Sequence, residues 1–246
     1  MSILVVTGTG TGVGKTVVTA ALAAATLQRG GSVAVVKPAQ TGVTADEPGD
    51  LQEVARLCGA RRLREFARFP DPLAPATAAR LRGMPAVDLD LVAAEVAQLR
   101  REIDLVLVEG AGGLLVHYDD DGRTLADLAR TLDAPVLVVT AAGLGTLNHT
   151  ALTLEVAAGR GLRLSGVVVG AWPAEPDLAM RCNLTDLTAL ANRPLAGVVP
   201  DGVGRRHWPD PEAFAAQARE WLAPAYGGTF DPSEWIRQQQ TSNGLD

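Results

Sequence analysis

The sequence predicts an α/β protein: a single domain with a mainly parallel, doubly wound sheet and helices on both faces. Short continuous apolar runs rich in Val, Ile and Leu alternate along the chain with segments of helical length. Continuous apolar runs are typical of strands that are covered on both faces. The strand–helix–strand order indicates parallel strands joined by right-handed crossovers. A chain of 246 residues is long enough to bury the core of one such domain.

The pattern predicts each element in order. The predicted strands cover residues 3–7, 32–37, 104–108, 135–140, 164–170 and 195–200. The predicted helices cover residues 15–28, 50–57, 89–102, 146–158, 177–191 and 211–222. Gly30 and Gly31 end the first helix, because glycine readily adopts the left-handed conformation found after a helix C-terminus.

Two segments lie outside this pattern. Residues 70–87 are rich in Pro and Ala, and we expect them to lie around the rim of the active site. We divide the chain into a main domain, residues 1–223, and a C-terminal extension of unknown role, residues 224–246. The polar run over residues 238–243 predicts a frayed end, although Trp235 and Ile236 offer apolar contacts that would hold part of the extension to the body.

The composition excludes several classes of protein. A net charge of −6 with no basic run argues against nucleic acid or an anionic membrane as a partner. No apolar stretch approaches the roughly 18 residues that span a bilayer, and the N-terminus lacks the features of a signal peptide. Cys58 and Cys182 form no C-x-x-C pair, so neither a disulfide framework nor a zinc site is expected. We expect a soluble, cytoplasmic protein.

Lysine is scarce in this chain. Of 22 basic residues only Lys15 and Lys37 are lysines, and all the others are arginines. Both lysines lie near the carboxyl ends of predicted strands, where open α/β sheets bind their ligands. A compact, mobile ammonium can act where a planar guanidinium cannot, so we predict a functional role for both.

The strongest motif is the run GTGTGVGKT, from Gly8 to Thr16, between the first predicted strand and the first helix. In a P-loop, backbone N–H groups and the helix N-terminus surround the phosphates, the lysine contacts the β and γ oxygens, and the hydroxyl binds Mg²⁺. Thr9 stands where the usual first glycine lies, but the Gly-Lys-Thr ending is intact. A dinucleotide-binding loop offers no role for that ending. The motif therefore predicts a P-loop NTPase fold that binds Mg²⁺ with ATP or another nucleoside triphosphate, through Thr9, Gly12, Val13, Gly14, Lys15 and Thr16.

An acidic residue ends the third predicted strand. Glu109 matches the Walker-B position, which holds Mg²⁺ directly or through water. In the following run of Gly110, Ala111 and Gly112, the glycines allow backbone to approach the γ-phosphate or the substrate. Asp50 is either a further metal ligand or the N-cap of a helix, and its position fits both. The expected metal ligands are Thr16, Asp50 and Glu109.

Two other strand-end segments are candidates for substrate binding. Lys37 begins the run KPAQTG and is expected to converge with Lys15, because strand-end loops line one crevice. Thr41 in that run fits a substrate contact and ordinary turn chemistry equally well. In LGTLNH, from Leu144 to His149, we expect Thr146 to be the N-cap of a helix that binds an anion such as a carboxylate. His149 is expected to be structural.

One acidic run is interpreted differently. The three aspartates before Gly122, at positions 119–121, are expected to form a solvated turn rather than a metal loop.

These motifs, in this order and spacing, resemble those of the dethiobiotin synthetases, the ATP-dependent ring-closing enzymes of biotin synthesis. The resemblance covers residues 2–222, and its most specific part is the LGTLNH segment, which generic P-loop proteins lack. It implies a homodimer with active sites at the subunit interface. In one subunit 7,8-diaminopelargonate would bind Thr11, Lys37 and Thr41. Its carboxylate would meet the other subunit at Gly145, Thr146, Leu147 and Asn148.

The resemblance also implies a reaction in three steps. CO₂ adds to an amine as a carbamate, the carbamate takes the γ-phosphoryl group, and the second amine closes the ureido ring with loss of phosphate. Lys15 and Lys37 would be the catalytic residues, since their charges neutralise the carbamate and the transferring phosphoryl group. The nucleotide site would also include Gly170, Ala171, Pro200, Asp201 and Gly202, at the ends of the last two strands.

The chain departs from the family pattern at two glycines. Many relatives carry an acidic residue at the position of Gly12, so the role of that acid is missing or supplied elsewhere. Gly170 stands where relatives often place an asparagine that reads adenine. A side-chain amide can bond both edges of a base, and glycine offers only backbone, so we predict weak discrimination among nucleoside triphosphates.

The sequence distinguishes this family from two other classes of protein that bind nucleotides, but not from a third. A partition-type ATPase would carry a second lysine in the P-loop, near the position of Gly10. A cobyrinate-type amidase would need a glutaminase domain, for which this chain is too short. A simple small-molecule kinase would bind ATP in the same way but release a phosphoester.

Overall fold

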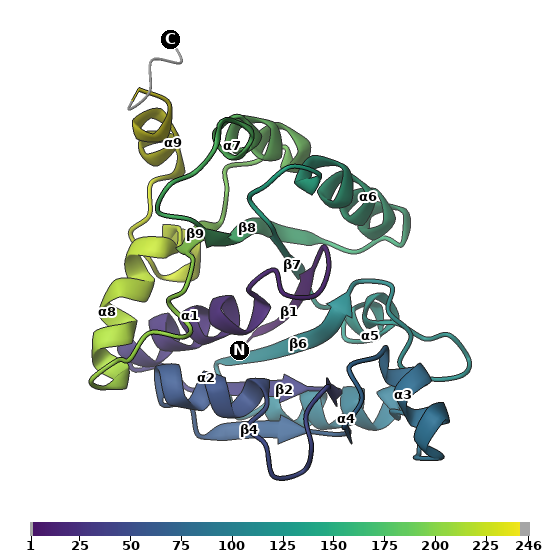
Figure 1. The fold of residues 1–246 in the computed structure, drawn as a ribbon. Helices are drawn as coiled ribbons and strands as arrows, with labels where there is room; N and C mark the ends of the chain where they lie inside the picture. Colours follow the sequence, from purple (N-terminus) through teal and green to yellow (C-terminus); the bar gives the residue numbers. More distant parts are fainter. Residues whose placement is uncertain (1, 242–246) are drawn as a thin grey trace.

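The structure, a computed structural model, describes residues 2–241 and has a central parallel sheet between two layers of helices (Figure 1). The strands of the sheet are β1 (Ser2–Gly8), β2 (Val33–Lys37), β4 (Arg62–Glu65), β6 (Leu105–Gly113), β7 (Val136–Thr140), β8 (Leu164–Trp172) and β9 (Gly197–Pro200). They form a seven-stranded sheet in the order β4-β2-β6-β1-β7-β8-β9, and every neighbouring pair is parallel. Two short strands, β3 (Gln40–Thr41) and β5 (Arg68–Phe69), pair separately.

Helices cover both faces of the sheet (Figure 1). The helices are α1 (Lys15–Gln28), α2 (Asp50–Cys58), α3 (Pro75–Arg82), α4 (Leu89–Leu99), α5 (Leu125–Thr131), α6 (Thr146–Gly159), α7 (Leu178–Ala191), α8 (Pro211–Trp221) and α9 (Pro232–Thr241), with a 3₁₀ turn at Pro224–Tyr226. α1, α2 and α8 pack on one face, and α4, α5 and α7 on the other. None of the helices in residues 2–241 is long and apolar enough to cross a membrane.

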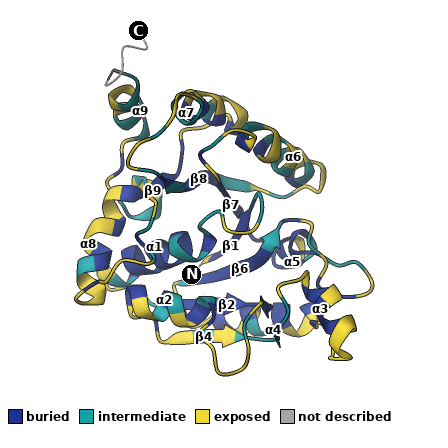
Figure 2. Ribbon diagram, in the orientation of Figure 1, coloured by how far each residue is buried: buried dark blue, intermediate teal, exposed yellow. Residues whose placement is uncertain are grey.

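Successive residues of a strand pack into two separate cores, one on each face of the sheet. Val5 packs in the core under α4, α5 and α7, whereas Val6 packs in the core under α1, α2 and α8, and both are fully buried. Figure 2 shows the inner strands of the sheet as mostly buried and the edge strand β4 as exposed. Burial on both faces explains why the inner strands are continuous apolar runs. The predicted α/β doubly wound fold is confirmed.

The predicted strands and helices all occur, most with shifted ends. Residues 2–241 contain seven further elements: β3, β4, β5, α3, α5, the 3₁₀ turn and α9. β4 was missed because its sequence, RLRE, is charged, and the strand lies at an edge of the sheet, where such residues remain accessible to solvent. β3 and β5 have two residues each, and α5 has only seven, so none shows a measurable periodicity. α3 was missed inside the Pro-rich segment, although Pro75 is its first residue, a favoured position for proline.

The C-terminal extension is folded onto the body as far as it is described. The ring of Trp235, on α9, stacks edge-on against Trp172 with centroids 5.1 Å apart and lies 5.7 Å from the ring of Phe230. Gln240 donates a hydrogen bond to the hydroxyl of Thr185 on α7, over 3.0 Å. The expected fraying is therefore wrong up to residue 241, and the last two residues of the polar run, 242 and 243, lie outside the described residues.

We expect Trp235→Ala to lower the free energy of unfolding by about 2 kcal/mol, because it removes a half-buried aromatic ring from two aromatic neighbours. Urea unfolding measures the change. Ser233→Ala, at an exposed position of the same helix, is the control and should change stability by less than about 0.5 kcal/mol. Equal urea midpoints for Trp235→Ala and the unchanged protein would show that α9 does not support the fold.

Candidate active site

The P-loop joins β1 to α1 and folds around the ammonium of Lys15. α1 begins at Lys15, directly after Gly14, whose φ of 96° favours glycine. Lys15 is only 8% exposed, and its Nζ donates to the carbonyl oxygen of Gly10, 2.9 Å away within the loop. Burial, followed by the charge of Lys37, lowers the pKa of Lys15 to about 8, although Glu109 and Asp50 oppose this shift.

The P-loop also lies directly against the end of β8. A Cβ atom on Gly170 would overlap the carbonyl oxygen of Val13, and one on Gly14 would overlap the carbonyl oxygen of Gly170. No side chain fits at either position without movement of backbone. Gly12 differs, since there is open space beside it, but its φ of 75° makes any side chain unfavourable.

Beside the P-loop, Lys37, Asp50 and Glu109 form a buried ion cluster. Lys37 is 2% exposed and Glu109 is fully buried. The Lys37 ammonium donates to Asp50 Oδ2, to Glu109 Oε1 at 2.9 Å and to the carbonyl oxygen of Gly110 at 3.2 Å. The hydroxyl of Thr16 donates to the same Glu109 Oε1 over 2.9 Å. The ion cluster therefore connects β2, β6 and α2 to the first turn of α1.

Pairing keeps Lys37 and Asp50 ionised despite their burial. Burial disfavours the ammonium of Lys37, but Glu109 and Asp50 outweigh that effect and raise the pKa of Lys37 above its usual value. Burial also disfavours the ionised form of Asp50, and Lys37 outweighs it, so the pKa of Asp50 lies below its usual range.

The oxygen atoms of this region fit a magnesium ion. Thr16, Asp50 and Glu109 offer only hydroxyl and carboxylate oxygens, the donors that Mg²⁺ prefers. Among the described residues, Glu109 Oε2 is buried and has no hydrogen-bond partner, which is costly for a carboxylate unless a cation satisfies it. Asp50 is not the N-cap of α2; Gly49 is, so that alternative is excluded. No group of three or more His, Cys, Asp or Glu residues suited to a metal occurs in residues 2–241.

A cavity of about 660 Å³ opens onto Lys15 and Lys37. The predicted site residues that line it are Thr11, Gly12, Gly14, Lys15, Thr16, Lys37, Thr41, Asp50, Ala111 and Gly112. Its rim includes Pro72, Leu73, Ala74 and Pro75, as expected for the Pro-rich segment.

Other predicted site residues lie outside that cavity. Those at the ends of β8 and β9 are Gly170, Ala171, Pro200, Asp201 and Gly202. Those at the start of α6 are Gly145, Thr146, Leu147 and Asn148. The N-cap of α6 is Gly145 rather than Thr146, whose buried hydroxyl instead donates to the carbonyl oxygen of Ala141 over 2.6 Å.

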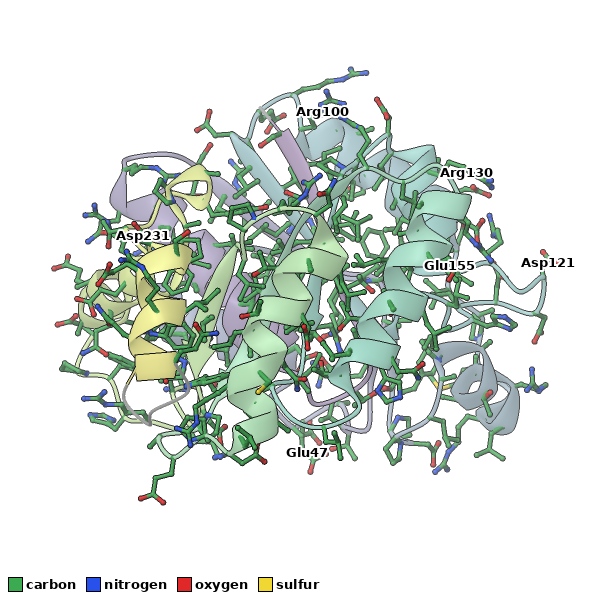
Figure 3. The ribbon with its side chains drawn as sticks, turned by 90° about the horizontal axis from the view of Figure 1, so that it is seen from above. Glu47, Arg100, Asp121, Arg130, Glu155 and Asp231 are labelled. Carbon is green, nitrogen blue, oxygen red and sulfur yellow. The ribbon has the colours of Figure 1, made fainter. Side chains whose placement is uncertain are left out.

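The turn before Gly122 is only partly solvated. Asp119 is buried and accepts hydrogen bonds from the backbone and the guanidinium of Arg123, so the expectation of a solvated turn is wrong for this residue. Asp121 does lie at the periphery of the molecule, as Figure 3 shows.

The sequence did not identify two structural supports of the site. The fully buried Tyr118 hydroxyl accepts a hydrogen bond from the Ala111 N–H over 2.7 Å, and burial raises the pKa of Tyr118. The Thr140 hydroxyl lies 2.6 and 2.7 Å from those of Thr146 and Thr150, and 3.4 Å from that of Thr9 in the P-loop. A lone tyrosine and scattered threonines carry no sequence signal, because these contacts form only in the fold.

Comparison with known proteins first tests the fold. A family model described as "AAA domain" matches residues 2–202. A chain of the MinC:MinD cell division protein complex of Aquifex aeolicus aligns with a TM-score of 0.57 at 15% identity, over 94% of this chain and 98% of that chain. FtsY of Mycoplasma mycoides aligns with a TM-score of 0.54 at 16% identity, over 99% of this chain and 68% of that chain. At such identities the likeness shows the fold alone, and it confirms the predicted P-loop NTPase fold.

Proteins found by sequence comparison are much more similar to this chain than these structural neighbours are. A protein of Frankia casuarinae named ATP-dependent dethiobiotin synthetase is 64% identical over 241 residues, which cover 98% of this chain and 100% of that protein. One of the same name from Streptomyces coelicolor is 59% identical over 231 residues, covering 94% and 96%. The chain belongs to the dethiobiotin synthetase family. It is therefore a ligase that forms C–N bonds, as predicted, and not a partition-type ATPase, despite the shared fold.

For this member of the family, Tyr118→Phe should lower the free energy of unfolding by about 1–2 kcal/mol, because it leaves the buried Ala111 N–H without an acceptor. Differential scanning calorimetry measures the loss. Tyr226→Phe is the matched control: its hydroxyl bonds the half-buried hydroxyl of Ser165, which water can replace as a partner. If both variants lose the same stability, the Tyr118 hydrogen bond does not support the site.

Proposed function

We propose that this chain forms dethiobiotin from 7,8-diaminopelargonate, CO₂ and ATP, with release of ADP and phosphate. The proposal rests on the relatives' name and on one structural observation: the two lysines of the chain line one cavity together with Thr16 and Asp50. The third candidate metal ligand, Glu109, is buried behind them and bonds both Thr16 and Lys37. A reaction through a carbamate and its anhydride with phosphate concentrates negative charge at one place. Fixed ammonium groups stabilise such charge.

The chemistry needs no side-chain nucleophile. One substrate amine attacks CO₂ and loses a proton to give a carbamate. A carbamate oxygen then takes the γ-phosphoryl group as the bond to ADP breaks. The second amine attacks the carbonyl carbon, the C–O bond to phosphate breaks, and the ureido ring closes. The protein contributes positioning and charge stabilisation.

We assign roles to the residues accordingly. The P-loop backbone and Lys15 bind the nucleotide phosphates, and Lys37 neutralises the carbamate and the transferring phosphoryl group. Thr16, Asp50 and Glu109 would hold Mg²⁺, which supplies positive charge at the β and γ phosphates. Glu109 Oε2, buried and unpartnered among the described residues, supports this assignment.

We also propose a homodimer that shares its active sites. Thr11 and Thr41 line the cavity beside Lys37 and are assigned to the diamine. The first turn of α6 lies outside that cavity, and Leu144 just before it is 92% exposed, so this helix end is accessible to a second subunit. We assign Gly145, Thr146, Leu147 and Asn148 to the substrate carboxylate of the partner's site. We place the enzyme in the cytoplasm.

Phosphate release tests the proposed reaction. The enzyme is given Mg²⁺, ATP and bicarbonate, with and without 7,8-diaminopelargonate, and the product is weighed by mass spectrometry. Diamine-dependent release, with a product heavier by one carbonyl less two hydrogens, is the expected result. Phosphate release at the same rate with and without the diamine would overturn the proposal, as would a phosphoester product.

We propose weak discrimination among nucleoside triphosphates, because position 170 carries no side chain to read the base. The backbone of Gly170, Ala171, Pro200, Asp201 and Gly202 is assigned to the base and sugar. We expect kcat/KM for ATP to exceed those for CTP and GTP by less than about a hundredfold. Steady-state kinetics with the three nucleotides measure the ratios, and a larger preference for ATP contradicts this proposal.

Lys37→Gln should reduce kcat by about a hundredfold or more while the Kd for ADP changes less than about threefold, since Lys37 acts on the charge that develops during transfer. Stopped-flow turnover and calorimetric ADP binding measure the two quantities. Because the substitution leaves two carboxylates without their cation, circular dichroism must first show that the variant is folded. Normal turnover by a folded variant would remove Lys37 from the mechanism.

A further inference from the structure

The ammonium of Lys37 contacts the same two carboxylates that are proposed to bind magnesium. It contacts both Asp50 and Glu109, the two carboxylates of that set, and shares Glu109 Oε1 with the hydroxyl of Thr16. We propose that Lys37 is the internal counter-ion of the metal site. In the metal-free protein it neutralises Asp50 and Glu109, and it leaves them for the cavity when a divalent cation binds. This inference rests on the proposed assignment of the metal ligands.

Electrostatic repulsion disfavours the binding of both cations to these carboxylates at the same time. Glu109 is fully buried and Lys37 is 2% exposed, so their charges interact through protein rather than through bulk water. A divalent cation on Asp50 and Glu109 would lie within a few ångströms of the ammonium and repel it. Without its carboxylates, the ammonium would become an uncompensated buried charge, which is strongly unfavourable.

The cavity provides a second position for the ammonium of Lys37. Lys37 and Asp50 both line it, together with Lys15. The four-carbon stem of lysine lets its ammonium move between the carboxylates and an anion in the cavity without movement of β2. Divalent cation binding would thereby free the Lys37 charge for the carbamate and phosphoryl group. The site would become strongly positive only when the metal is in place.

The rarity of lysine allows a direct test on the unchanged enzyme. Lysine labelled with ¹³C at Cε and ¹⁵N at Nζ gives signals from Lys15 and Lys37 alone, since the chain has no other lysine. A Lys15→Arg sample assigns them. We expect ADP with EDTA to shift the signals of Lys15 but not those of Lys37. We expect Mg²⁺ with ADP to shift Lys37 and to speed exchange of its ammonium protons by about tenfold or more, because the paired carboxylates are lost. Lys37 signals and exchange that are the same with Mg²⁺ and ADP as with ADP and EDTA would overturn the inference.

A variant tests the competition from the metal side. Lys37→Met removes the internal cation, so Mg²⁺ without nucleotide should bind at least about tenfold more tightly than to the unchanged protein. Calorimetric titration and the Mg²⁺-dependent rise in Tm measure this affinity. Lys15→Met is the matched control, because the Lys15 ammonium bonds the carbonyl of Gly10 rather than either carboxylate, and its effect should stay below about threefold. Equal or weaker Mg²⁺ binding by folded Lys37→Met would overturn the inference.

These measurements do not depend on the reaction. They use only Mg²⁺ and ADP, so an enzyme that failed the phosphate-release experiment could still show Lys37 leaving its carboxylates. If Lys37→Met does not fold, the labelled lysines of the unchanged protein still decide the question.

Discussion

The buried charge of Lys37 determines how the site is built. Lys37 is nearly inaccessible, and its charge is tolerable in the interior only because Asp50 and Glu109 face it. Lys37 lies on β2, Glu109 on β6 and Asp50 in the first turn of α2. These segments are distant in sequence and adjacent in the fold. Thr16 joins α1 to the same carboxylate. Correct placement of each of these segments is therefore needed to balance the charge of the others.

The parallel sheet makes this convergence possible. Its strands all end at one edge, so the segments that follow β1, β2 and β6 meet there, as in other open α/β sheets. The same frame occurs in the cell division protein complex and in FtsY at 15–16% identity, where it shows only a common fold. Membership of the family rests instead on the 64% identity to a dethiobiotin synthetase, which extends over 98% of this chain.

The sequence could predict those parts of the molecule that depend on local pattern. Buried strands, amphipathic helices and the Gly-Lys-Thr ending are readable because each has a characteristic period or spacing. The charged edge strand β4, the seven-residue α5 and the support of Ala111 by Tyr118 were missed, because pairing and packing across the fold determine them. Asp50 shows the same limit: its position in the sequence fitted a helix cap and a metal ligand equally, and the cap is excluded only by the fold, in which Gly49 is the N-cap.

The contact between the P-loop and β8 has a consequence for protein engineering. The carbonyl of Val13 occupies the space into which any side chain at position 170 would have to grow. An asparagine introduced there by a single exchange would displace the phosphate-binding loop before it could read a base. A side chain that contacts a nucleotide base can therefore be added to this scaffold only from another segment, or after a compensating change in the loop. The order in which such substitutions are made would decide whether the intermediate enzymes remain active.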